Sequence, residues 1–190
     1  MFKKWKRKLS LILRIIKGKR HPGIKIVADV KHFRGGKLIW EGKDLEIATN
    51  GLMDEGEENM LDSYFRNQNT PTSFYVGLGN NGGVPGIPAE TATLATITEV
   101  AGTGYARQAL NRNITDWPTL ALDAGDYQVT STSKSFSNSG GSAWTAADYL
   151  FLTNVVSGTA GKLLVTVALS VSRILQAADQ LNVTIKCKLQ

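Results

Sequence analysis

The sequence predicts a mainly β protein: an antiparallel β-sandwich of jelly-roll or immunoglobulin-like type, with one short helix and an N-terminal amphipathic basic helix. Many short stretches alternate apolar and polar residues from about residue 23 onward, and turns rich in Gly, Asn, Ser and Asp separate them. Charge is also unevenly spread, because residues 1–43 carry 14 Lys and Arg against two acidic residues, whereas residues 44–190 carry 8 against 14. We therefore expect a basic attachment arm (1–22), a β-hairpin connector (23–49) and a β-sandwich domain (50–190).

The arm has apolar residues at helical spacing. At about 100° per residue, most apolar side chains fall on one side of a helix and most Lys and Arg on the other. Gly18 and Pro22 are expected to end this helix. We expect the arm to dock onto a partner, and the residues assigned to docking are Phe2, Lys3, Lys4, Trp5, Lys6, Arg7, Lys8, Leu9, Ile12, Arg14 and Ile16.

A basic amphipathic helix has more than one use. Docking onto a protein assembly is the expected one, and the alternatives are packing on its own body, lying on an anionic membrane surface and contacting nucleic acid. A secretory signal does not fit, because Arg14 interrupts the apolar run and no small-residue cleavage site follows. The apolar run is also too short to span a bilayer.

A β-hairpin is predicted next. Apolar residues alternate with mostly polar ones from Ile24 to Val30, Arg34-Gly35-Gly36 supplies a reversal, and an extended pattern resumes over 37–41. His32 lies beside this turn with no other histidine or cysteine near it in sequence. We therefore expect His32 to be a solvated side chain rather than a metal ligand.

One helix is predicted in the body, after residue 51. Asp54 is expected to cap it, with Glu57 completing a capping box. Negative charge near a helix start is explained by the helix dipole, so the acidic cluster is not interpreted as a calcium site or an acid–base pair. The apolar stripe of this helix consists of Met60, Leu61, Tyr64 and Phe65.

Beyond about residue 72 the chain is expected to be extended, with a long loop over 79–88. Strands are predicted over 73–78, 93–100, 105–110, 127–131, 134–136, 149–153, 163–171 and 181–189. The last strand alternates cleanly and places Cys187 on the same side as Val183 and Ile185. Cys187 is therefore expected to be a small core residue and not a nucleophile.

No catalytic or cofactor-binding pattern is found. The glycines of 79–86 lack the Gly-Lys-Ser/Thr ending of a phosphate loop, no Gly-x-Ser-x-Gly occurs, and one cysteine with two histidines cannot build a cysteine zinc cluster. A two-carboxylate hydrolase stays open, because sequence does not reveal the distance between carboxylates. We nevertheless predict no enzyme, no cofactor, no metal and no small-molecule substrate, since these aspartates all have turn-like surroundings: Asp116, Asp123, Asp126 and Asp148.

Several short motifs follow one another along the body in a characteristic order. They include Thr49-Asn50-Gly51-Leu52, the stretches 60–65 and 73–78, Gly104-Tyr105-Ala106-Arg107-Gln108, and the stretch 143–152. Over about residues 37–190 this order resembles a family of small structural proteins of tailed bacteriophages, often labelled tail-fibre or minor virion proteins. The resemblance implies a non-enzymatic component of the virion built on a β-sandwich.

We therefore expect a structural component of a tailed bacteriophage virion, either a capsid-decorating, neck or tail-attached protein, docked to the particle by its basic arm. The expected partners are other virion proteins and further copies of the chain, with a trimer as the expected homo-oligomer. The arm could in addition contact DNA or an anionic surface. The alternative function is a membrane-surface or carbohydrate-binding β-sandwich module.

Overall fold

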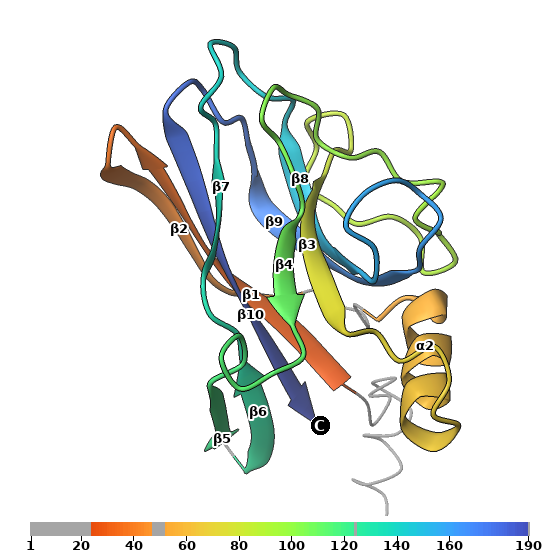
Figure 1. Cartoon of the computed structure of the whole chain (residues 1–190). Helices are drawn as coiled ribbons and strands as arrows, with labels where there is room; N and C mark the ends of the chain where they lie inside the picture. The colour runs from red at the N-terminus through yellow and green to blue at the C-terminus, as the bar shows by residue number, and fades with distance from the viewer. Residues whose placement is uncertain (1–23, 47–51, 124, 190) are drawn as a thin grey trace, which may run out of the picture.

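The computed structural model describes residues 24–46, 52–123 and 125–189. The predicted arm helix and all of the residues assigned to docking, which lie between Phe2 and Ile16, fall outside the described residues. Within the described ranges, the chain is mainly β, with two antiparallel sheets and one helix (Figure 1). In chain order the elements are β1 (Ile24–Arg34), β2 (Lys37–Leu45), α2 (Asp54–Phe65), β3 (Ser73–Gly79), β4 (Gln108–Asn111), β5 (Thr119–Asp123), β6 (Asp126–Thr130), β7 (Lys134–Ser137), β8 (Ala147–Thr153), β9 (Leu163–Arg173) and β10 (Asp179–Leu189).

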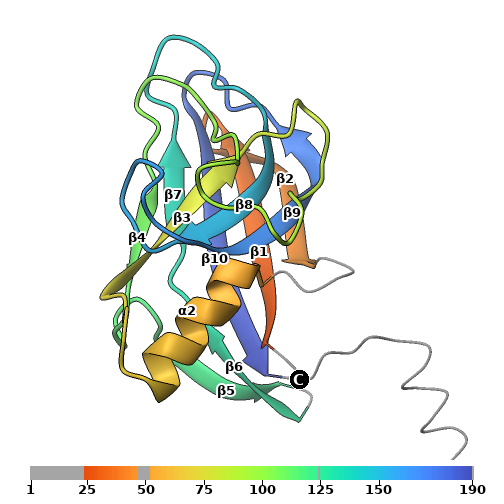
Figure 2. The same ribbon diagram turned by 90° about the vertical axis from the view of Figure 1, so that its right-hand side faces the viewer.

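The strands form a larger and a smaller sheet. The larger sheet has the order β2-β1-β10-β6-β5, with β7 also pairing with β10, and the smaller sheet has the order β4-β3-β8-β9. Figure 2 shows the smaller sheet lying in front of the larger one, with α2 below it. This arrangement confirms the predicted mainly β chain with two antiparallel sheets and a helix in the body.

Both sheets contribute to one hydrophobic core. Val30 of β1 and Ile185 of β10 are buried from the larger sheet, and Val76 of β3 and Leu150 of β8 are buried from the smaller one. Each such side chain contributes about 1.5–3 kcal/mol when it is fully removed from water. The shared core is what holds the sheets together as a sandwich.

The predicted hairpin is present at the edge of the larger sheet. Gly35 and Gly36 have φ angles of 54° and 77°, the left-handed values that a two-residue hairpin turn requires at both positions. Strand β1 pairs with β10 along its whole length, from Ile24 opposite Leu189 to Arg34 opposite Asp179. The hairpin therefore packs as part of the sandwich, and β1 joins β10 near the centre of the larger sheet.

One strand prediction is wrong, one is right only in part, and one strand was not predicted. Residues 93–100 form a turn and irregular backbone with an isolated bridge from Glu99 to Gly79, and the Leu94 side chain is buried in a second apolar cluster beside β8. Strand β4 spans Gln108–Asn111, so it contains only residues 108–110 of the expected 105–110 strand. Strand β5 was missed because all five of its residues are exposed and its sequence lacks a buried face.

The prediction of a solvated His32 is wrong. The His32 side chain is buried, and its Nε2 atom lies 3.0 Å from Oδ2 of Asp179. The register of β1 and β10 places these residues together although 147 positions separate them in sequence. A neighbour this distant is invisible to local sequence patterns.

The prediction that Asp148 lies in a turn is also wrong, whereas Asp116 does lie in a turn. Asp148 belongs to β8, is fully buried, and accepts hydrogen bonds from the backbone N–H of Asn81 and Gly83 and from Ser172 Oγ. The carboxylate therefore holds the glycine-rich loop after β3 against the smaller sheet. This explains its burial, because a buried carboxylate needs several donors.

Candidate protein-interaction surface

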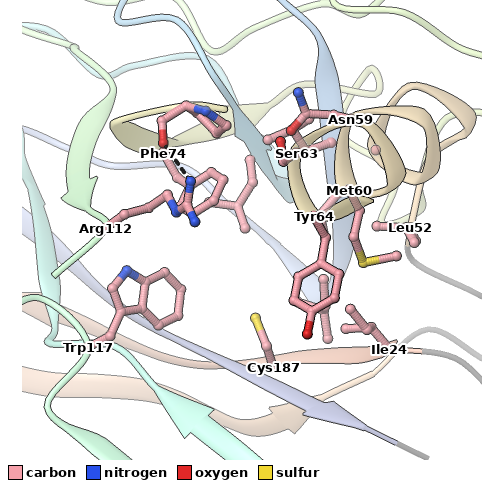
Figure 3. A pocket seen from close by; sticks show the side chains of 16 residues that line it. Ile24, Leu52, Asn59, Met60, Ser63, Tyr64, Phe74, Arg112, Trp117 and Cys187 are labelled. Atoms are coloured by element: carbon pink, nitrogen blue, oxygen red, sulfur yellow. Dashed lines mark hydrogen bonds between the residues drawn. The ribbon is translucent and has the colours of Figure 1, made fainter. Parts of the chain in front are cut away.

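An apolar cavity of about 290 Å³ lies between α2 and the nearby ends of both sheets (Figure 3). We call it the α2 cavity. In Figure 3, Tyr64 of α2 and Trp117 lie on opposite sides of the cavity, with Cys187 of β10 between them. Ile24, the first described residue of the chain, also lines it, so the basic arm joins the body at this cavity. Its apolar lining includes Ile24, Leu52, Met60, Tyr64, Phe74, Trp117 and Cys187.

The polar side chains around the α2 cavity hold the loop that follows α2. Arg112 Nη1 donates to the carbonyl oxygen of Pro71 at 3.1 Å, and Asn59 Nδ2 donates to that of Asn69 at 3.0 Å. Ser63 Oγ also points to the Asn69 carbonyl, at 3.5 Å. These contacts give the lining polar groups a structural role and form no acid–base pair.

Cys187 is the one cysteine of the chain, and it lines the cavity. Burial raises the pKa of its thiol to about 12, so the thiol stays protonated at neutral pH. Because the thiolate is the nucleophilic form, this raised pKa makes Cys187 a poor nucleophile at neutral pH. Its position next to the core supports the prediction that it is an apolar packing residue.

Helix α2 packs on β9 through a face other than its apolar stripe. Its buried residues are Gly56, Asn59 and Asp62. A Cβ atom at Gly56 would lie 2.1 Å from the Leu164 carbonyl oxygen, so glycine permits the close approach of helix and strand.

The apolar stripe instead forms an exposed outer face of α2. Leu61 is 54% exposed, Tyr64 82% and Phe65 76%, while Met60 lies at the cavity rim. The rings of Tyr64 and Phe65 meet edge to face with centroids 5.0 Å apart. An exposed aromatic and aliphatic patch of this kind is typical of a protein-interaction site.

The start of α2 is acidic, but its cap differs from the prediction. Met53 occupies the N-cap position without a side-chain hydrogen bond, and Asp54 is the first helical residue, so the expected capping box is wrong. Glu55 Oε2 accepts the backbone N–H of Leu163 at 2.7 Å, and Glu58 pairs with Lys162. These contacts attach the acidic end of the helix to the beginning of β9. The acidic residues therefore have a structural role in packing α2 on the smaller sheet.

The hairpin of β5 and β6 adds a second exposed apolar patch. Leu120 is 70% exposed and Leu122 64%, and Tyr127 on β6 is also exposed. Figures 1 and 2 both show this hairpin, α2, the beginning of β1 and the end of β10 at the same end of the molecule. We call this end, with the α2 cavity, the outer face of α2 and the β5–β6 hairpin, the arm end.

The arm end differs from the rest of the described surface in its aromatic residues. Among the described residues, all three exposed aromatic side chains belong to it: Tyr64, Phe65 and Tyr127. Aromatic side chains are enriched where proteins bind one another and often dominate the binding free energy. The arm end is therefore the candidate interaction surface of the body.

Sequence reasoning and structure agree on this surface only in part. The residues assigned to docking lie outside the described ranges, so their docking role stays a prediction. The apolar stripe of α2 was identified from the sequence, whereas the α2 cavity and the β5–β6 patch were not. The available signal was the five acidic residues among the twelve of α2, which leave little room for a fully buried helix.

Metal binding and membrane crossing are two further possibilities for such a surface. In the described part of the chain, His, Cys, Asp and Glu side chains form no group of three or more that could hold a metal ion. Among the described residues, no helix has the length and apolar character needed to cross a membrane.

Comparison with known proteins identifies one family. The family described as podophage GP4 fiber I protein gp80 matches residues 51–187, which is more than half of the chain. The match begins after the β1–β2 hairpin, so both the hairpin and the arm lie outside it. No curated protein matches the chain.

Proposed function

We propose that this chain, which belongs to the podophage GP4 fiber I protein gp80 family, is held in the phage particle at its arm end, with the basic arm of residues 1–22 docking onto another virion protein. Membership of a phage fibre family makes the chain a structural component of the virion, associated with other virion proteins. The docking role of the arm is our addition. It extends the family assignment to residues that the family match does not include.

The observation that carries the proposal is where the arm joins the body. Ile24 lines the α2 cavity, and the exposed aromatic residues Tyr64, Phe65 and Tyr127 belong to the same end. Because the arm is joined to an apolar end of the body, the arm and the arm end can both contact the same partner. Two linked contacts bind more tightly than either alone, because the second forms at a high effective concentration.

Charge supports the same arrangement. Residues 1–22 contain nine Lys and Arg and no acidic residue, whereas the chain beyond residue 43 is acidic overall. A partner surface that carries carboxylates would attract the arm and hold its orientation. A contact with this much charge weakens as salt increases, because counterions screen it.

The proposal is tested by particle incorporation of full-length variants. Leu9→Ser removes an apolar side chain from the docking side of the arm, and Leu11→Ser makes the same change at a position that breaks the helical pattern. We expect Leu9→Ser, combined with Trp5→Ser, to reduce the amount of the chain in purified particles at least about tenfold, since interface aromatic residues dominate binding. Leu11→Ser should incorporate normally, and mass spectrometry of purified particles gives the amounts.

The controls separate docking from folding and from the membrane alternative. All variants should share the thermal midpoint of the unaltered chain, because the arm precedes the body's first strand. Normal incorporation of the Trp5→Ser, Leu9→Ser chain would contradict the docking role. Flotation of the unaltered chain with anionic liposomes, lost in the same variant, would assign the arm to a membrane surface instead.

A further inference from the structure

We infer that the α2 cavity and the outer face of α2 receive the basic arm of a second copy of this chain, so that exchanged arms link neighbouring copies in the virion. This inference rests on the proposed function, and it names the virion protein onto which the arm docks. It assigns an occupant to an apolar surface that the body leaves open.

The electrostatics of the two surfaces are complementary. Helix α2 contains five acidic residues in twelve and no Lys or Arg. Lys162 and Arg66 pair with Glu58 and Asp62, and the group still keeps a net negative charge. The one basic side chain that lines the cavity, Arg112, lies across the cavity from α2 (Figure 3). An arm with nine basic residues therefore meets its opposite charge on the α2 side.

The apolar surfaces also correspond. The arm presents Phe2, Trp5, Leu9 and Ile12 on one side of its predicted helix. The α2 cavity, at about 290 Å³, falls just below the size of most pockets that bind drug-sized ligands and suits large side chains. An amphipathic helix placed beside α2 could insert an aromatic residue into the cavity and cover Leu61 and Tyr64 with its remaining apolar side chains.

The position of the aromatic residues favours a second copy over the arm's own body. As a helix, residues 2–17 would be about 24 Å long. Ile24 lines the arm's own cavity, so an arm that continued outward from there as one straight helix would carry its far aromatic residues away from that cavity. Phe2 and Trp5 would therefore reach the cavity of a neighbour.

Arm exchange would also set the symmetry of the assembly. Each copy donates one arm and offers one cavity, which is a head-to-tail contact between two different surfaces. Such contacts close into a ring when the rotation between copies permits. The expected trimer is one such closed ring.

A mixing experiment with full-length chains tests the exchange. Trp5→Ser weakens the arm and leaves the cavity intact, whereas Tyr64→Lys places a positive charge at the cavity and leaves the arm intact. Tyr64 is 82% exposed, so its replacement should not affect folding. Leu38→Lys, on β2 near the hairpin turn at the other end of the molecule, is the matched control. Sedimentation velocity gives the mass of each species.

The expected pattern is complementation. The unaltered chain and Leu38→Lys should form oligomers, and each of the other two variants alone should associate at least about tenfold more weakly. An equimolar mixture of Trp5→Ser and Tyr64→Lys should recover a two-chain complex, because the intact arm of one fits the intact cavity of the other. Added salt should weaken this complex.

Three results would overturn the inference. If the unaltered chain stays monomeric at micromolar concentrations, arms are not exchanged. If the mixture of Trp5→Ser and Tyr64→Lys associates no more strongly than either variant alone, the arm does not enter a neighbour's cavity. Normal oligomers from Trp5→Ser would show that another surface links the copies. If Trp5→Ser is also lost from particles in that last case, the arm docks on a different virion protein, so the proposed function stands and only arm exchange is wrong.

Discussion

His32 Nε2 on β1 lies 3.0 Å from Asp179 Oδ2 on β10, inside the protein. Arg34 also donates to Asp179, from Nε at 2.9 Å and from Nη2 at 2.8 Å. These hydrogen bonds from Arg34, assisted by the backbone N–H of Gln176 and by His32, lower the pKa of Asp179 to about 2. The cluster fastens β1 to β10 at the end opposite the arm, and it makes the body's stability sensitive to pH.

The first prediction concerns His32. Burial lowers the pKa of the imidazole, with smaller contributions from Arg173 and Arg34, although Asp179 acts in the opposite direction. Unfolding returns His32 to its ordinary pKa of about 6.5. Just below that pH the unfolded chain therefore binds a proton at His32 more readily than the folded chain does. The free energy of unfolding should therefore fall as pH decreases below about 6.5, by up to about 1.4 kcal/mol per pH unit.

Urea unfolding at pH 7.5 and at pH 5.0 checks this slope in the unaltered chain and in His32→Gln. The variant should be less stable at both pH values and should lose most of the difference between them. Asp179 stabilises the fold above its unfolded pKa near 3.9 and loses that effect only as pH falls toward 2, so it contributes little to this window. Equal slopes in the two chains would show that His32 is not the titrating group.

The second prediction concerns Gly56. A methyl group there would lie 2.1 Å from the Leu164 carbonyl oxygen, so Gly56→Ala must push α2 away from β9. We expect a loss of about 1–3 kcal/mol in the free energy of unfolding, the usual cost of overpacking. The matched control is Gly141→Ala, because Gly141 has no neighbouring atom within 4 Å of the added Cβ. Equal stability of the two variants in urea would mean that α2 is loosely attached.

The third prediction separates the exposed face of α2 from the core. Leu61 is 54% exposed, whereas Leu110 on β4 is fully buried. Leu61→Ser should change the free energy of unfolding by about 0.5 kcal/mol or less, as surface substitutions do. Leu110→Ser should cost about 2–5 kcal/mol, because it leaves a cavity and buries a hydroxyl group. A large loss for Leu61→Ser, measured by thermal unfolding, would place that face in the core.

The sequence predicts the elements of this fold better than their packing. Alternation in the sequences of β9 and β10 identifies both strands, and in β10 it matches alternating burial from Leu181 to Lys186, because a half-buried strand has a period of two. Gly35 and Gly36 identify the hairpin for a similar local reason. These predictions depend only on neighbouring residues.

Predictions that depend on distant partners fail. His32 was expected in solvent because nothing near it in sequence reveals Asp179, 147 residues away. The stripe of α2 was identified from its spacing, but periodicity shows only which residues share a face and not which face meets the sheet. Here Gly56 brings the opposite face onto β9. The α2 cavity could not be predicted at all, since α2 together with strands and loops from seven separate stretches between residues 24 and 187 lines it.

The place of β10 in the larger sheet has a consequence for biosynthesis. Strand β10 pairs with β1, β6 and β7, so three strands made earlier share one partner that is made last among the described elements. While the ribosome is still translating residues before 179, the inner edges of β1, β6 and β7 have no partner strand. Pairings this distant in sequence form slowly, and unpaired strand edges promote aggregation. The β1–β2 and β5–β6 hairpins can form earlier, but they are joined into one sheet only after residues 179–189 have been translated. A nascent chain stalled before that stretch therefore exposes three strands to misassembly with its neighbours on the same messenger RNA.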